Sequence, residues 1–278
     1  MKTLFILACL ALIAFECFAT PINPFVINGQ EAEPHSAPYI VSMQLTNRTG
    51  ITKKSRHRCG GSILNENWVI TAAHCVVNVP PNHWLELFAG RHDLRLTESE
   101  ENGQSRRLEK IIVHEKYIQR DDEPYDIALL KVVKPFELNN DTIKAIRLPP
   151  AGETQTGNST LFGWGSISTN LTSVIPPILQ TSNLPLIPYE ICEAVMNGLG
   201  LSPMHPSFIC TGPLLGNGGA CSGDSGGPLV QYKDDGEPEL IGLAAWVPLL
   251  PCGSPNSPSA FTKVSYFIDW INENMKDD

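Results

Sequence analysis

The nine residues CSGDSGGPL, from Cys221 to Leu229, decide how the rest of the chain is interpreted. Glycines on both sides of Ser225 permit unusual backbone dihedral angles and let another chain approach the backbone closely. The stretch is therefore typical of a nucleophilic serine on a tight turn. A flexible Gly/Ser loop is the common alternative, so this prediction needs support from other parts of the sequence.

Two other stretches supply the partners that a nucleophilic serine requires. A serine hydroxyl needs a base within hydrogen-bond reach, and the base needs a third group to hold it. The sequence TAAHC at 71–75 places His74 just after an apolar run. The sequence DIALL at 126–130 places Asp126 at the start of another apolar run, where a strand entering the core could bury its carboxylate. Together with Ser225, these residues predict a catalytic triad.

These motifs, in this order and spacing, resemble those of the chymotrypsin-like serine proteases, and the resemblance runs from Val26 to the C-terminal helix. It implies an all-β fold of two six-stranded antiparallel barrels, with the active site in the cleft between them and a C-terminal helix. His74 would accept the proton of Ser225, and Asp126 would orient the imidazole. The backbone N–H groups of Gly223 and Ser225 would form the oxyanion hole. This chemistry requires no cofactor and no metal.

The same resemblance predicts synthesis as a zymogen. The sequence that begins at Val26 is similar to the new N-terminus that these proteases gain on activation. Its amine would then pair with the buried Asp224, and this pair would act as a conformational switch. Phe25 precedes the cleaved bond, where Arg or Lys is usual. An activating protease that cuts after large apolar residues is therefore expected.

Specificity is predicted from the residues that would line the substrate pocket. Alignment on the nucleophile motif places Gly219 at the pocket floor, where trypsin-like members have an aspartate. A substrate Lys or Arg would be buried there without a partner, so cleavage after basic residues is disfavoured. Ser222, Val247 and Ser259 complete the predicted pocket. Val247 and Ser259 stand where glycines admit large aromatic side chains, so we expect a preference for small or medium aliphatic residues, as in the elastase-like branch.

Two residues depart from the family pattern. Ala245 stands where a serine usually supports the buried aspartate, and Tyr125 replaces a small polar residue. A secreted homologue that is catalytically weak or inactive and acts by binding is therefore the alternative function. A disulfide-stabilised inhibitor or toxin is a third class, which the size of the chain disfavours.

The charge of the chain limits its partners. The formal net charge of −9 argues against a nucleic-acid partner. We expect protein or peptide substrates, an activating protease and protein inhibitors as partners, and a monomeric enzyme. The basic cluster KKSRHR at 53–58 is interpreted as a solvated loop, and His57 within it is given no catalytic role. Glu98, Glu100 and Glu101 are interpreted as a solvated acidic loop in preference to a calcium site.

The N-terminal residues predict export. Lys2 precedes an apolar run at 4–15 that is too short to span a bilayer, so 1–19 is interpreted as a signal peptide. A propeptide at 20–25 and a peptidase domain at 26–278 follow, with barrels at about 26–147 and 148–278. The enzyme is therefore expected to be secreted, with no membrane association, and a digestive role is expected by analogy.

Six cysteines remain after removal of the signal peptide, and by themselves they allow fifteen disulfide pairings. The resemblance implies the pairs Cys59–Cys75, Cys192–Cys210 and Cys221–Cys252. Zinc binding is disfavoured because CxxC pairs are absent from the sequence. The candidate glycosylation sites are Asn47, Asn140, Asn158 and Asn170.

Short apolar runs among Gly, Pro, Asn and Asp clusters predict strands. In the first barrel the runs are 39–45, 84–89, 108–113 and 127–133. After a linker at 148–152 they are 161–164, 180–186, 208–211, 228–232, 240–246 and 260–264. The segment 189–196 is expected to be helical, and so is the C-terminal segment, with Ser265 as its N-cap.

Overall fold

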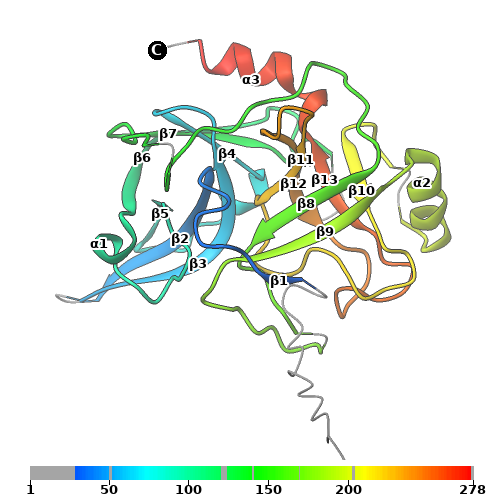
Figure 1. Ribbon diagram of the computed structural model, residues 1–278, viewed down its shortest axis with the longest axis horizontal. Coiled ribbons are helices and arrows are strands. Elements are labelled where there is room, and N and C mark those ends of the chain that lie inside the picture. Colours follow the sequence, from blue (N-terminus) through cyan, green and yellow to red (C-terminus); the bar gives the residue numbers. More distant parts are fainter. Residues whose placement is uncertain are drawn as a thin grey trace, which may run out of the picture.

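The computed structural model describes residues 29–49, 52–119, 124–139, 141–168, 170–201 and 204–276. Within these ranges the chain forms two closed six-stranded antiparallel barrels and few helices, which confirms the predicted fold class. Figure 1 shows the two barrels next to each other, the first in blue to green and the second in green to red, with the short C-terminal helix above them.

Six strands close the first barrel in the order β2-β3-β4-β7-β6-β5. They are β2 (Ile40–Thr49), β3 (Thr52–Ile63), β4 (Trp68–Thr71), β5 (His83–Ala89), β6 (Gln104–Val113) and β7 (Ala128–Val132). The 3-10 helix η1 (Ala73–Cys75) follows β4, and the short α1 (Glu98–Glu101) precedes β6. Each strand predicted for this barrel overlaps one of these strands.

The second barrel closes through the pairing of β8 with β9, and β1 extends the edge of β9. Its elements are β1 (Gln30–Glu31), β8 (Asn158–Gly163), β9 (Gln180–Ile187), α2 (Tyr189–Gly198), β10 (Phe208–Thr211), β11 (Pro228–Tyr232), β12 (Pro238–Trp246), β13 (Ser259–Lys263), η2 (Val264–Tyr266) and α3 (Ile268–Asn274). All six strands predicted for this barrel and the helix at 189–196 are confirmed.

Two local predictions are wrong. The basic cluster at 53–58 is not a loop, because it lies within β3 and pairs with β2. Its charged side chains project from a strand, and the backbone hydrogen bonds are supplied by the neighbouring strand. Ser265 does not cap α3, which begins at Ile268. Ser265 lies in η2, and its Oγ donates a hydrogen bond of 2.8 Å to the carbonyl of Glu153.

Strands β4 and β7 are buried on both faces, which explains why their sequences are continuous apolar runs. Val69 and Leu130 pack inside the first barrel. Ile70 and Leu129 pack in a second cluster that includes core residues of the second barrel and of α3. The two strands therefore contribute to the face through which the first barrel contacts the second.

Candidate active site

Strand pairing brings His74 to Asp126. In the register of β4 with β7, Thr71 lies opposite Ala128. His74 follows β4 in η1, and Asp126 precedes β7 by two positions, so the two residues lie at the same end of the paired strands. The pairing of β4 with β7 thus also places His74 next to the Asp126 carboxylate.

The Asp126 carboxylate holds His74 by two hydrogen bonds. Oδ1 accepts from the His74 backbone N–H at 2.9 Å, and Oδ2 lies 2.7 Å from Nδ1 of the ring. Because a carboxylate only accepts, Nδ1 carries a proton, and Nε2 of the neutral imidazole is free to accept one. Asp126 is 4 % exposed, and within the described part of the chain its carboxylate accepts no other hydrogen bond.

All three predicted disulfides are present, and the first lies beside His74. The pairs are Cys59–Cys75, Cys192–Cys210 and Cys221–Cys252. His74 Nε2 lies 3.6 Å from the sulfur of Cys75. Both sulfur atoms near the imidazole belong to the disulfide, so they cannot act as thiolate ligands for a metal ion.

The turn that carries Ser225 is fixed against the first barrel. The carbonyl of Ser225 accepts a hydrogen bond of 2.8 Å from the N–H of Gly60, the residue after the disulfide-bonded Cys59. Gly226, with φ of 71°, lies so close to Thr71 that a Cβ atom there would come within 2.1 Å of its Oγ1. Ser225 thus lies beside the segment that leads from β4 to His74. Its side chain makes no hydrogen bond to any described residue, His74 included.

Two backbone donors of this turn are unused. The N–H groups of Gly223 and Ser225 donate no hydrogen bond within the described ranges, whereas the N–H groups of Asp224 and Gly227 are bonded inside the turn at 2.9 and 2.8 Å. Gly223 has φ of 103°, a conformation that favours glycine. The turn therefore presents two free donors next to the Ser225 hydroxyl, as an oxyanion hole requires.

The buried Asp224 carboxylate anchors the turn that carries Ser225 through hydrogen bonds. Its carboxylate is 1 % exposed and accepts hydrogen bonds from the N–H groups of Gly165 at 2.8 Å and Cys221 at 2.9 Å. Burial raises the pKa of Asp224 to about 6, and these two hydrogen bonds oppose the increase. No cation pairs with it among the described residues. The predicted partner, Val26, lies outside them, as does the bond after Phe25.

His57 is a component of this site that the sequence interpretation missed. Its Nδ1 lies 2.8 Å from Ser42 Oγ, and its Nε2 lies 2.8 Å from the carbonyl oxygen of Gly223. Because that carbonyl can only accept, Nε2 carries the proton, and burial lowers the pKa of His57 to about 4. His57 is therefore a neutral ring that fixes the peptide between Gly223 and Asp224. Its partner is distant in the chain, so no local pattern indicated the contact.

A cavity of about 130 Å³ lies next to Ser225, where the specificity pocket is predicted. Its lining residues are Ala220, Cys221, Ser222, Ser225, Ala244, Ala245, Trp246 and Val247. Two of the predicted residues, Ser222 and Val247, line it, but Gly219 and Ser259 do not. Both lie next to the lining residue Ala220: Ser259 Oγ accepts a hydrogen bond of 2.9 Å from the Ala220 N–H and would lie 2.6 Å from a Cβ atom on Gly219. Ser259 thus fills the space in which a side chain at position 219 would extend.

The acidic segment 98–101 pairs with a cationic side chain of the protein itself, Arg91. Glu101 is buried and accepts a hydrogen bond of 2.6 Å from Arg91 Nε, while its other oxygen accepts from the backbone of His92 and Asp93. Glu100 caps the first turn of α1 at Thr97. The carboxylates are therefore engaged by the protein itself, and the buried Glu101 departs from the predicted solvated loop.

Replacement of Gly226 tests how closely the turn approaches β4. Gly226→Ala is expected to destabilise the protein by about 2–4 kcal/mol, since the new Cβ would meet Thr71 Oγ1 and, at 2.8 Å, the carbonyl of Gly60. Gly152→Ala is a matched control, because φ is 72° there and nothing lies within 4 Å. It should cost about 1 kcal/mol. Equal losses in urea unfolding would contradict the close approach.

The sequons lie in different environments. Asn158 at the start of β8 and Asn170 in the following loop are exposed. Asn47 lies within β2, and its Nδ2, the atom that carries an N-linked glycan, lies 3.2 Å from His83 Nε2. Asn140 lies outside the described residues.

Comparison with known proteins gives one consistent result. The family model described as Trypsin matches residues 26–271. The chain is 37% identical to Lectizyme of Glossina austeni over 260 residues, which cover 90% of this chain and 86% of that protein. It is 36% identical to Trypsin-1 of Astacus astacus over 251 residues, which cover 90% and 99%. Ovochymase-2 of Mus musculus is 34% identical over 263 residues, which cover 90% of this chain but 41% of that longer protein.

Proposed function

Because the chain belongs to the trypsin family of serine endopeptidases, we propose that His74, Asp126 and Ser225 are its catalytic triad. The observation that supports this most directly is the pair of hydrogen bonds that Asp126 accepts from His74. They fix the ring in the tautomer that leaves Nε2 free to act as a base.

The reaction follows from this geometry in two stages. Ser225 Oγ attacks the peptide carbonyl while His74 Nε2 takes its proton, and the N–H groups of Gly223 and Ser225 bind the oxyanion. Expulsion of the amine, which receives the proton from His74, leaves an acyl group on Ser225. A water molecule then attacks the acyl carbon, again with His74 as base, and releases the new carboxylate. Asp126 stabilises the imidazolium in each stage.

A serine-directed covalent inhibitor tests whether the site is active. Treatment of the activated protein with a fluorophosphonate should label Ser225, which peptide mass spectrometry can locate. Labelling should disappear in His74→Ala, because the hydroxyl then has no base. A homologue that acts only by binding would leave Ser225 unmodified. Ala245 provides no hydroxyl for Asp126, so slow labelling of Ser225 would still support an active site.

We also propose that the enzyme is secreted and made as a zymogen, with a signal peptide at 1–19 and a propeptide at 20–25. The buried Asp224, which has no cation partner among the described residues, supports a role for the Val26 amine as that partner after cleavage. No helix among the described residues has the length and apolar character of a membrane span. We propose in addition that the enzyme has a digestive role and carries glycans on Asn158 and Asn170. Its proposed protein partners are an activating protease and protein inhibitors.

For substrate preference, we propose small or medium aliphatic residues before the cleaved bond. The small cavity next to Ser225 supports this, because Val247 lines it and Ser259 fills the space next to Gly219. No acidic side chain lines the cavity, so a bound Lys or Arg would have no partner there.

The variant Val247→Gly should shift this preference. Removal of the isopropyl group is expected to raise kcat/KM for substrates with Phe or Tyr before the bond by about 10–100-fold relative to Val or Leu. Val247→Ala should give an intermediate ratio. Cleavage-site profiling on a peptide library measures all three enzymes, and an unchanged ratio, or dominant cleavage after Lys or Arg, would contradict the proposed pocket.

A further inference from the structure

Tyr125, the residue before Asp126, has a backbone conformation that tyrosine rarely adopts. Its φ is 66°, in the left-handed region. The other non-glycine residues with positive φ in the described part of the chain are five asparagines and His35, and both residue types enter this region more readily than a bulky residue does. Such a conformation costs free energy and persists only where the surroundings impose it. We therefore examine which contacts hold Tyr125.

Rings from both barrels contact the side chain of Tyr125. His114, which follows β6, stacks on it with the ring centroids 4.9 Å apart, and Lys116 Nζ lies 5.4 Å from its centroid. From the second barrel, the His205 ring lies 5.0 Å away, and Phe267, just before α3, lies edge-on at 6.0 Å. These separations are those of favourable aromatic contacts. The position of the Tyr125 ring is thus determined by both halves of the molecule.

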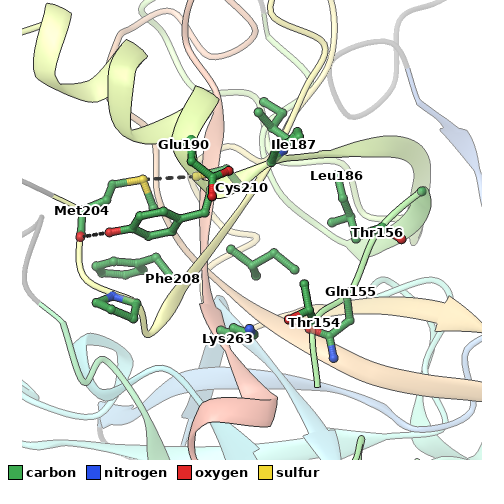
Figure 2. Close-up of a pocket in the computed structure, with 15 residues that line it drawn as sticks. Thr154, Gln155, Thr156, Leu186, Ile187, Glu190, Met204, Phe208, Cys210 and Lys263 are labelled. Carbon is green, nitrogen blue, oxygen red and sulfur yellow. Dashed lines mark hydrogen bonds between the residues drawn. The ribbon is translucent and has the colours of Figure 1, made fainter. Parts of the chain in front are cut away.

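His205 is itself anchored in the second barrel. Its Nδ1 accepts a hydrogen bond of 3.1 Å from the Ser207 backbone N–H, and burial lowers its pKa. The ring is therefore neutral at pH 7 and carries its proton on Nε2, which donates to the Tyr125 hydroxyl oxygen at 3.4 Å. The preceding carbonyl, that of Met204, accepts a hydrogen bond from the Tyr189 hydroxyl (dashed in Figure 2). The Tyr125 ring thus contacts a segment that is fixed at several points.

The backbone of Tyr125 determines where the Asp126 backbone lies. The carbonyl of Tyr125 accepts a hydrogen bond of 2.8 Å from the Ile127 N–H, which closes a tight turn with Asp126 at its centre. The carbonyl of Asp126 accepts a hydrogen bond of 2.8 Å from Thr262 Oγ1. Within the described ranges the Asp126 carboxylate is hydrogen-bonded only to His74. Its position therefore depends on the conformation of this turn.

We propose that Tyr125 is a positioning residue for the triad: the rings around it impose its left-handed backbone, and this backbone holds the Asp126 carboxylate against His74. The inference rests on the proposed function, because it assigns a role within the proposed triad. It also relates the two departures from the family pattern. Ala245 provides no hydroxyl for the carboxylate, so the turn that contains Tyr125 carries more of the task of placing it.

The kinetics of activated Tyr125 variants test this role. Tyr125→Ala loses the ring contacts, so kcat should fall by about 10–100-fold, whereas KM should change by about twofold or less because Tyr125 does not line the cavity next to Ser225. Tyr125→Phe keeps the ring and should retain kcat within about twofold. Tyr125→Gly should retain more activity than Tyr125→Ala, because glycine adopts positive φ readily. Tyr232→Ala, at a half-exposed tyrosine outside this group of rings, is the matched control and should leave kcat unchanged.

A double-mutant cycle with Asp126→Asn separates positioning from a general loss of structure. If Tyr125 acts through the carboxylate, Tyr125→Ala should change kcat by about twofold or less once that carboxylate is an amide. A role in stability alone would give the same fold-loss of kcat in both backgrounds. Tyr125→Leu retains most of the apolar volume and takes the place of Tyr125→Ala in the cycle if that variant does not fold.

Three results would overturn the inference. These are equal losses of kcat in the two backgrounds, a loss in Tyr125→Phe as large as that in Tyr125→Ala, or a Tyr125→Ala enzyme at least as active as Tyr125→Gly. The proposed function fails in a different way. Full activity in Asp126→Asn would refute the triad, whereas an inactive Asp126→Asn enzyme together with additive losses would refute only the role of Tyr125.

Discussion

Replacement of Ser225 by alanine is expected to lower kcat/KM for peptide hydrolysis by about 10⁴–10⁶-fold in the activated enzyme. The substitution removes the nucleophile and leaves the free N–H groups of Gly223 and Ser225 in place. His74→Ala should have an effect of the same size, and the double variant should lose little more, because the two residues act as one unit. Asp126→Asn should cost about 10⁴-fold, since an amide no longer imposes the tautomer with its proton on Nδ1.

The measurement is the initial rate on a chromogenic peptide with Ala, Val or Leu before the bond. Ser99→Ala, at an exposed position of α1, is the control and should retain full activity. Circular dichroism and thermal unfolding should show that the variants remain folded. Additive losses in the double variant, or activity that persists without Ser225, would contradict the proposed triad.

Asp224→Asn should lower the activity of the cleaved enzyme by at least about 10³-fold. The amine released at Val26 would then have no charged partner, and the turn that holds both oxyanion donors would lose its internal anchor; loss of one such donor alone typically costs about 10²–10³-fold. The uncleaved wild type should be as inactive as the cleaved variant. Full activity in cleaved Asp224→Asn would contradict the proposed role of the pair. Asp234→Asn, at an exposed acid, is the matched control.

The same residue predicts a dependence of stability on pH in the uncleaved chain. Burial raises the pKa of Asp224 to about 6, above its value in the unfolded chain, so the folded state favours the protonated form. The charged form therefore costs stability, and the cost develops as pH rises from about 4 to about 6 and then stays constant. Relative to Asp224→Asn, the uncleaved wild type should lose about 3 kcal/mol over this interval. Urea unfolding of both proteins at pH 4 and pH 7 measures the difference.

The sequence predicted the strands beside His74 and Asp126 because strands buried on both faces leave a clear apolar run, whereas the closure into two barrels was implied by the family resemblance. Ile70 and Leu129 contact the other barrel while Val69 and Leu130 fill their own, so β4 and β7 have no polar face. Strand β3 leaves no such signal at 53–58, where the outer side chains are charged. Its strand character depends on pairing with β2, which no local composition shows.

The environment of His57 and the lining of the cavity next to Ser225 could not be predicted for a related reason. His57 contacts Gly223, which is 166 positions away, and Ser259 lies against Gly219 without lining the cavity. Such distances are set by how the loops of the second barrel pack. The sequence predicted Ser259 as a pocket residue, but Ser259 does not line the cavity.

The burial of β4 and β7 on both faces has a consequence for how this enzyme can change. A different side-chain volume at Leu129, on the face shared by the two halves of the molecule, would alter the spacing between the acid–base pair and the nucleophile. The same change at Leu130, inside one half, would loosen that half and leave the spacing intact. Thermal stability can therefore be adjusted at Leu130, which faces the interior of its own barrel. Catalytic turnover can be adjusted at the neighbouring Leu129, which faces the other barrel.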